Sequence, residues 1–260
     1  MNDIGPREGV PSPPSPTGLF HGAPAYQPLT SWPPLLAVVV SVLIVLASTL
    51  LLFSGAAVAR LAGLIADRWD TAELVGLGLW QALTVALTLV AAGMLGGRPR
   101  DALALGRPVA TPLVYVKALL LMAALQVVVS LVQHSYFRQD MYADLRPFVR
   151  LFNEHWLLAL LIVGVGAPLS EELLFRGFLQ SALTRSRLGF WGGALITTSL
   201  WTVLHAGYSK VGIAEVFLIG MFLSWLLWRT GSLRVTIVCH AVYNSLVVVT
   251  LRYVPLPAPS

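Results

Sequence analysis

The sequence has 260 residues, of which 57% are hydrophobic and 11% charged, with a formal net charge of +5. Soluble domains carry about 25% charged residues, so this chain has too few polar side chains to cover a water-exposed surface. The composition excludes an ordinary soluble enzyme, and no basic stripe alternates with aromatic residues in the way that indicates nucleic-acid binding. We therefore expect a membrane protein built from apolar helices.

A proline-rich segment opens the chain. Residues 1–34 contain nine of the 17 prolines, in runs such as VPSPPSPTG and SWPP. This composition favours an extended, disordered tail that does not pack. The segment lacks the basic region and the small-residue cleavage site of a signal peptide, so we expect the first apolar helix to stay in the mature protein.

Apolar stretches follow one another from residue 35 to residue 254. A membrane core of about 30 Å needs about 20 apolar residues in a helix. The stretches predicted as membrane helices are 35–58, 72–95, 112–132, 156–168, 170–185, 190–205, 213–228 and 233–254. The predicted fold is an all-α polytopic membrane helical bundle with seven to eight transmembrane helices.

Two features subdivide this bundle. The polar, amphipathic link at 133–155 favours a segment that lies along the membrane interface. Pro168 followed by Ser170 predicts a helix break and a fresh N-cap. We expect four parts, which are the tail at 1–34, the N-terminal transmembrane helices and interfacial link at 35–154, a helical unit at 155–254 and a short tail at 255–260.

Three charged residues stand inside the apolar segment GAPLSEELLFRGFLQSAL. An ionisable residue at the centre of a membrane helix costs roughly 2.5–3.5 kcal/mol, so Glu171, Glu172 and Arg176 would together cost about 8–10 kcal/mol if unpaired. Glu172 and Arg176 are four residues apart in the order that favours a salt bridge, acid first. Glu171 points about 100° away, which leaves it without a local partner.

Two later helices carry further polar groups. His205 ends an otherwise apolar helix, and His240 and Asn244 share one face of the last helix. Each has a structural interpretation, with His205 as an interfacial residue at a helix end and the other two as interhelical hydrogen-bonding groups. However, a small bundle would have to provide partners for one carboxylate, two histidines and an amide at once. This combination also suggests a catalytic site.

These four residues suit the hydrolysis of a peptide bond. A carboxylate and a histidine that share a water form a general-base site. A second histidine and an asparagine amide can donate to the oxyanion that forms when water attacks the carbonyl. Glu171, His205 and His240 could instead hold Zn²⁺, because two His and one Glu form a catalytic zinc ligand set. No H-E-x-x-H helix is present, which excludes a standard zincin site.

Three short motifs resemble those of the CPBP intramembrane proteases, the group of type 2 CAAX prenyl endopeptidases and Abi-like bacteriocin-processing proteins. EELLFR at 171–176 is similar to the E-E-x-x-x-R motif of that family, and HAVYN at 240–244 is similar to its H-x-x-x-N motif. WTVLH at 201–205 resembles the F-x-x-x-H motif, with Trp in place of Phe. The resemblance covers about 167–246, so the unit at 155–254 is expected to hold CPBP-like catalytic helices.

The resemblance implies an intramembrane endopeptidase that hydrolyses a peptide bond in a membrane-tethered or hydrophobic peptide or protein. It implies that Glu171 activates water and that His205 assists it or binds a metal. It further implies that His240 and Asn244 stabilise the oxyanion, with Glu172 and Arg176 in support. The favoured interpretation requires no cofactor, and zinc held by Glu171, His205 and His240 is the alternative.

Two other functions compete with hydrolysis. A non-catalytic membrane adaptor or bacteriocin-immunity-type protein would keep the fold and bind a partner through the polar face. A proton-coupled transporter would use Glu171 and Glu172 as a relay, although one helix break and no internal repeat argue against it. In the favoured case we expect an integral protein of the cell membrane, in contact with lipid and with a hydrophobic or lipid-anchored substrate, and with no nucleic-acid partner.

Overall fold

The computed structural model describes residues 19–253 except 21, 62–68, 110 and 140–141, and these residues form helices and no strands. The rest of the chain, including the tail predicted at 255–260, lies outside the described residues. The elements in chain order are α1 Pro34–Leu61, α2 Trp69–Gly96, α3 Pro99–Ala102, α4 Leu113–Ser135, η1 Ala143–Phe148, α5 Val149–Glu154, α6 Trp156–Ala159, η2 Leu160–Gly166, α7 Ala167–Glu171, η3 Glu172–Gln180, α8 Ser181–Thr184, α9 Gly189–Val203, α10 Lys210–Thr230 and α11 Leu233–Leu251.

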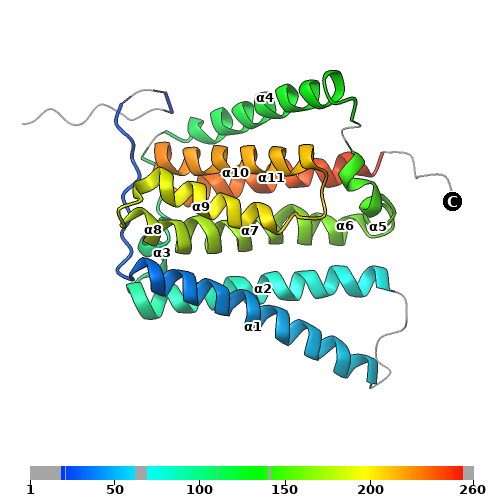
Figure 1. The fold of residues 1–260 in the computed structure, drawn as a ribbon, viewed down its shortest axis with the longest axis horizontal. Coiled ribbons are helices and arrows are strands. Elements are labelled where there is room, and N and C mark those ends of the chain that lie inside the picture. The colour runs from blue at the N-terminus through cyan, green and yellow to red at the C-terminus, as the bar shows by residue number, and fades with distance from the viewer. Residues whose placement is uncertain (1–18, 21, 62–68, 110, 140–141, 254–260) are drawn as a thin grey trace, which may run out of the picture.

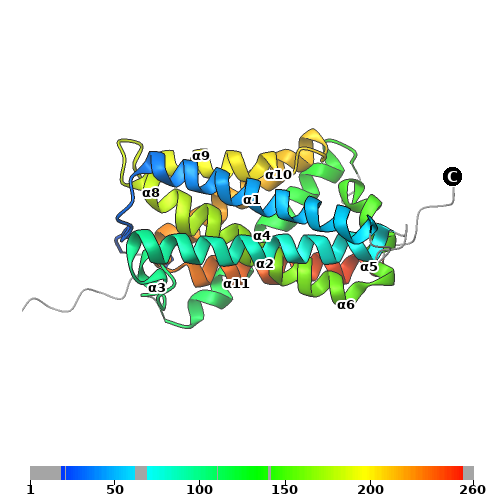
Figure 2. The ribbon, with the colours of Figure 1, turned by 90° about the horizontal axis from the view of Figure 1, so that it is seen from below.

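The long helices lie alongside one another in layers (Figure 1). α1 and α2 form the outer layer on one side, and α4 lies on the opposite side against α10 and α11. The run from α6 to α8 lies between these layers, and the view from below shows α1 and α2 crossing in front of it (Figure 2). The segment 172–183 is buried at every position, so the centre of the bundle coincides with the helix that carries the charged motif.

The central helix is continuous through Pro168, and the predicted break there is wrong. α6, η2, α7, η3 and α8 follow one another without interruption, with π-helical turns in η2 and η3. The wider π turn before Pro168 makes room for its ring, which would collide with the preceding turn of a regular α-helix. Ser170 does not cap a new helix, because its hydroxyl donates to the carbonyl oxygen of Ala167 at 3.0 Å.

Six of the described helices are long and apolar enough to cross a bilayer, and the expected seven to eight are not confirmed. The six spans are Pro34–Ser54, Leu74–Gly96, Leu113–Ser135, Trp156–Thr184, Lys210–Thr230 and Leu233–Leu251. Two predicted helices merge into the central one, and α9 has 15 residues, fewer than the about 20 that a bilayer core needs. The chain is therefore an integral membrane protein with a shorter helix packed among its spans.

The described part of the proline-rich segment packs against the bundle, contrary to the expectation of an unpacked tail. The side chains of Leu19 and Trp32 are 3% and 2% exposed. An extended chain leaves its carbonyl groups unpaired, and Arg229 donates to those of Leu19 at 2.7 Å and Gly22 at 3.1 Å. The segment is thus held by hydrogen bonds from the Arg229 side chain to its carbonyl groups and by one deeply buried tryptophan, which its composition did not indicate.

Replacing Trp32 with Ala is expected to destabilise the protein by about 3–5 kcal/mol, the usual cost of deleting a buried aromatic ring. The indole stacks on Phe178 of the central helix with ring centroids 4.7 Å apart, and its N–H donates to the Phe178 carbonyl at 3.3 Å. Denaturant unfolding in detergent micelles measures the change. Trp32→Phe keeps a ring and loses the hydrogen bond, so it should cost only about 1 kcal/mol, and equal losses in the two variants would contradict the packing role.

Candidate active site

A buried ion pair lies on the central helix. The guanidinium Nη1 of Arg176 lies 3.0 Å from Glu172 Oε1, and both side chains are 0% exposed. The salt bridge predicted from the spacing is therefore confirmed. Two opposite charges this deep in a membrane bundle stabilise each other only while both are present, because either alone would be an uncompensated buried charge.

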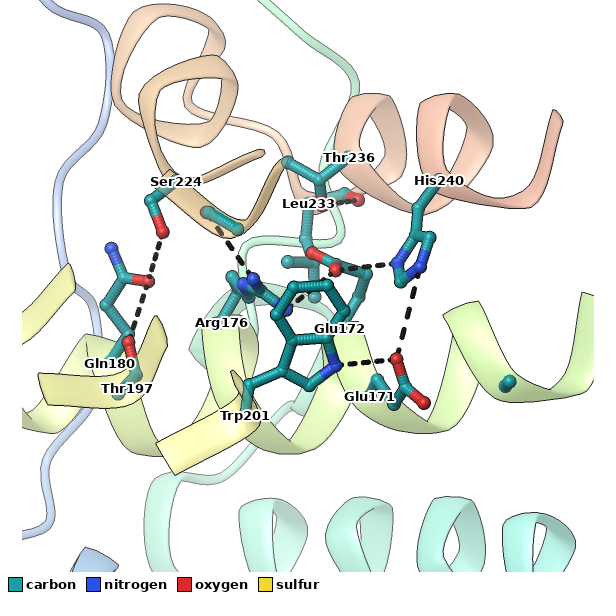
Figure 3. Close-up of polar contacts among 12 residues, drawn as sticks. Glu171, Glu172, Arg176, Gln180, Thr197, Trp201, Ser224, Leu233, Thr236 and His240 are labelled. Atoms are coloured by element: carbon teal, nitrogen blue, oxygen red, sulfur yellow. Dashed lines mark hydrogen bonds and ion pairs between the residues drawn. The ribbon is translucent and has the colours of Figure 1, made fainter. Parts of the chain in front are cut away.

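Glu172 also orients His240. The same carboxylate oxygen, Oε1, lies 3.1 Å from His240 Nδ1, so α11 is joined to the central helix through this contact (Figure 3). A carboxylate accepts hydrogen bonds and cannot donate them, so Nδ1 carries the proton in this contact. The other ring nitrogen, Nε2, is then the atom that His240 presents to the site, as in other carboxylate–histidine pairs.

Glu171 faces His240 across a gap. Its Oε2 lies 4.0 Å from His240 Nε2, and 16% of the Glu171 side chain is exposed. This separation is too long for a direct hydrogen bond, but two hydrogen bonds of about 2.8 Å that meet at nearly a right angle span it. The geometry therefore suits a single water shared by a carboxylate and an imidazole.

Trp201 supplies a contact that the sequence reasoning missed. Its indole Nε1 donates to Glu171 Oε2 at 2.7 Å (Figure 3). From the sequence, we considered residue 201 only as an aromatic residue that stands in place of the Phe of the second motif. The only signal for this hydrogen bond in the sequence was the replacement of Phe by Trp, because Trp carries an N–H that Phe lacks.

His205 reaches the site through Trp201. Its Nδ1 lies 3.3 Å from the Trp201 carbonyl oxygen, and its ring packs edge-on against the indole with centroids 5.1 Å apart. The ring also contacts Tyr208 at a centroid distance of 5.3 Å. His205 is thus half-buried beside the cluster, and its assistance to the water remains a prediction.

Tyr208 is a second group that sequence reasoning did not single out. It lies in the turn between α9 and α10, and burial raises the pKa of Tyr208 to about 12, with further contributions from the carboxylates of Asp144, Glu171 and Glu215. A phenol with this pKa stays protonated at neutral pH. Tyr208 therefore brings a neutral hydroxyl donor close to the negatively charged side of the site.

Asn244 has a structural partner. Its Nδ2 donates to the carbonyl oxygen of Val163 at 3.1 Å. In the π register seen where Ala167 N–H bonds to Ile162, the Val163 carbonyl would pair with residue 168, and Pro168 has no N–H. Asn244 satisfies this carbonyl with one of its two amide hydrogens, which leaves the second for another acceptor.

The predicted zinc ligands do not come together as a set. No group of three or more His, Cys, Asp or Glu side chains suited to a metal ion is found among the described residues. Glu171 and His240 face each other at 4.0 Å, and His205 does not complete a group of three with them. Catalytic zinc sites use three protein ligands, which these residues do not provide together, so the arrangement does not fit zinc.

Comparison with known proteins finds similarities that include the charged motif. Residues 153–246 match the family model described as type II CAAX prenyl endopeptidase Rce1-like, in agreement with the CPBP resemblance of the three motifs. The chain is 39% identical over 87 residues to an uncharacterized 24.3 kDa protein of Escherichia coli, covering 32% of this chain and 40% of that protein. It is 26% identical over 83 residues to the UPF0177 protein YxdF of Lactococcus lactis, covering 32% and 44%. The chain thus spans less than half the length of these relatives, and no solved structure matches it.

Proposed function

Because residues 153–246 match the type II CAAX prenyl endopeptidases, we propose that this membrane protein is an intramembrane endopeptidase that uses water activated by Glu171. The observation that carries the proposal is the pair formed by Glu171 and His240, which face each other across 4.0 Å at the centre of a membrane bundle. A carboxylate that is partly exposed in such a place is costly, and a functional role explains why it is retained.

The positions of these groups support the following reaction. A water between Glu171 and His240 attacks the carbonyl carbon of the peptide bond while Glu171 takes one of its protons. The new carbon–oxygen bond places a negative charge on the former carbonyl oxygen. When the carbon–nitrogen bond breaks, Glu171 returns the proton to the leaving amine, so that one water is consumed and both products are complete.

The oxyanion needs hydrogen-bond donors within reach of the former carbonyl oxygen. His240 presents Nε2, which donates when the ring carries both protons, because Nδ1 is committed to Glu172 at 3.1 Å. Asn244 lies one helical turn further along α11 and has a second amide hydrogen beyond the one bonded to Val163. Two such donors stabilise the transition state by several kcal/mol in a site with little water.

The place of this site in the bundle supports a substrate class. The charged cluster is surrounded by helices that are apolar enough to cross a bilayer, so a substrate that is itself held in the membrane meets the site without leaving lipid. We propose a hydrophobic or lipid-anchored peptide, of the CAAX type by the family match, with the protein in the cell membrane.

A non-catalytic adaptor is the second candidate, and one observation favours it. Asn244 bonds to the Val163 carbonyl and His205 faces the Trp201 carbonyl, so two of the four proposed catalytic groups already have structural partners. An adaptor would use these polar groups only for packing and would need none of them for chemistry. It would bind its partner without cleaving it.

The test uses the full chain reconstituted in liposomes with a synthetic peptide ending in Cys-aliphatic-aliphatic-X, either prenylated on the cysteine or not. We expect the prenylated peptide to be cleaved after the cysteine, with a KM at least about tenfold lower than that of the bare peptide, because the lipid concentrates it in the bilayer. Mass spectrometry identifies the products. Binding of the prenylated peptide without any product from either peptide would favour the adaptor.

A further inference from the structure

Trp201 lies at the centre of the candidate active site and is 2% exposed. Its N–H donates to Glu171 at 2.7 Å, and the guanidinium carbon of Arg176 lies 4.5 Å from the centroid of its ring. The rings of His205 and His240 meet it edge-on, with centroids 5.1 Å and 5.6 Å away. One indole therefore contacts side chains that come from the central helix, from the turn after α9 and from α11.

We propose that Trp201 is the positioning residue for the base, holding Glu171 Oε2 toward His240 through its indole N–H. The inference rests on the proposed hydrolytic function and adds a residue to it. The Phe expected at this position from the second motif has no polar hydrogen, so the contact is a property of this chain and not of the motif.

The hydrogen bond matters because a glutamate side chain otherwise rotates freely. Glu171 is 16% exposed, and its partner across the gap, His240, is 4.0 Å away and makes no direct bond to it. The 2.7 Å bond from Trp201 falls on Oε2, the same oxygen that faces His240. Hydrogen bonds to charged groups are short and strong, so this contact keeps the carboxylate in the orientation that a shared water requires.

The indole is itself held in place. A Cβ atom at Gly220 would lie 3.0 Å from Trp201 Cε3 and 2.9 Å from Arg176 Nη2, so glycine leaves the space that both groups fill. The Arg176 cation over the face of the ring draws electron density from it, which makes the N–H a better donor to the carboxylate. Arg176 thus acts on Glu172 directly and on Glu171 through the tryptophan.

Kinetics of Trp201→Phe test the proposal. The variant keeps a ring and removes the N–H, and we expect kcat on the prenylated peptide to fall by about 10- to 100-fold with little change in KM, because a misplaced group costs rate rather than binding. Trp80→Phe is the matched control, since it removes an indole N–H that donates to Thr49 Oγ1 at 3.2 Å between α1 and α2. That control should leave kcat unchanged within about twofold.

A spectroscopic measurement reads the same bond without turnover. Ultraviolet resonance Raman bands of tryptophan respond to hydrogen bonding at the indole N–H, and subtracting the Trp201→Phe spectrum from that of the unaltered protein isolates Trp201. We expect the band of a strongly bonded indole, shifting toward that of a weaker bond in Glu171→Gln, because an amide oxygen accepts less strongly than a carboxylate.

The outcomes separate this inference from the proposed function. An unchanged kcat in Trp201→Phe, a rise in KM alone, or a Raman band that ignores Glu171→Gln would each overturn the positioning role. If the unaltered protein cleaves no peptide, the proposed function fails, while the Raman comparison still reports on the bond. If Trp201→Phe fails to fold, the Raman difference between the unaltered protein and Glu171→Gln decides the question. The Trp80→Phe difference spectrum is then the comparison.

Discussion

Replacing Glu171 with Gln is expected to lower the rate of peptide hydrolysis by about 10²- to 10⁴-fold, the usual contribution of a positioned general base. Glutamine has nearly the same size, and its carbonyl oxygen can still accept the hydrogen bond that Trp201 now donates to the carboxylate at 2.7 Å. It cannot take a proton from water. The loss is therefore expected in kcat, with helical content and unfolding midpoint close to those of the unaltered protein.

Glu154→Gln is the matched control for this prediction. That glutamate is 46% exposed and pairs with Arg150 outside the site, so its replacement removes a carboxylate with little expected change in activity. Single-turnover cleavage of the prenylated peptide measures both variants at equal protein and lipid concentrations. Hydrolysis by Glu171→Gln at more than about a tenth of the normal rate would rule out Glu171 as the base.

Replacing Arg176 with Met is expected to destabilise the protein by about 3–5 kcal/mol, because it leaves Glu172 as a buried charge without its cation. The pair is 0% exposed on both sides, and Arg176 also reaches the Gly220 carbonyl at 3.4 Å. Methionine fills much of the same volume, so the loss reports on charge more than on packing. Activity should fall too, since Glu172 orients His240 at 3.1 Å.

Two further variants make the Arg176 prediction specific. Arg150→Met breaks an ion pair whose side chains are 73% and 46% exposed, and it should cost no more than about 1 kcal/mol. The double variant Glu172→Gln with Arg176→Met removes both buried charges and should recover part of the stability. Unfolding of all three in mixed micelles gives the comparison, and a double variant less stable than Arg176→Met would contradict the charge argument.

The charged motif was predictable because local spacing determines it. Glu172 and Arg176 stand four residues apart on one helix, and nothing outside that helix is needed to infer their 3.0 Å contact. The role of His240 toward Glu172 was not predictable in the same way. It depends on how α11 packs against the central helix, and residues 172 and 240 are joined by tertiary structure alone.

The course of the chain at Pro168 illustrates the other limit. Proline inside a helix usually indicates a break, but the preceding π turn accommodates the ring and Asn244 satisfies the Val163 carbonyl at 3.1 Å. The compensation comes from a residue 81 positions after Val163 in the sequence, so local reasoning could not anticipate it. The packed Trp32 is a similar case, since its partner Phe178 lies in the central helix.

Trp201 shows what similarity to a motif can conceal. Treating Trp as an acceptable substitute for Phe was sound for ring packing, because the indole is buried among the site residues. The comparison of Trp with Phe overlooked the indole N–H, which donates to Glu171. The chemistry of a substitution therefore had to be judged from the surroundings of the side chain in the folded chain.

The proposed mechanism depends most on where a bound peptide places its scissile bond. A structure of Glu171→Gln with an uncleaved prenylated peptide in lipid measures this directly. We predict that the scissile carbonyl carbon lies beside the gap between residue 171 and His240, with its oxygen within hydrogen-bond distance of His240 Nε2. A peptide bound on another face of the bundle, with its carbonyl far from both residues, would contradict the proposed site.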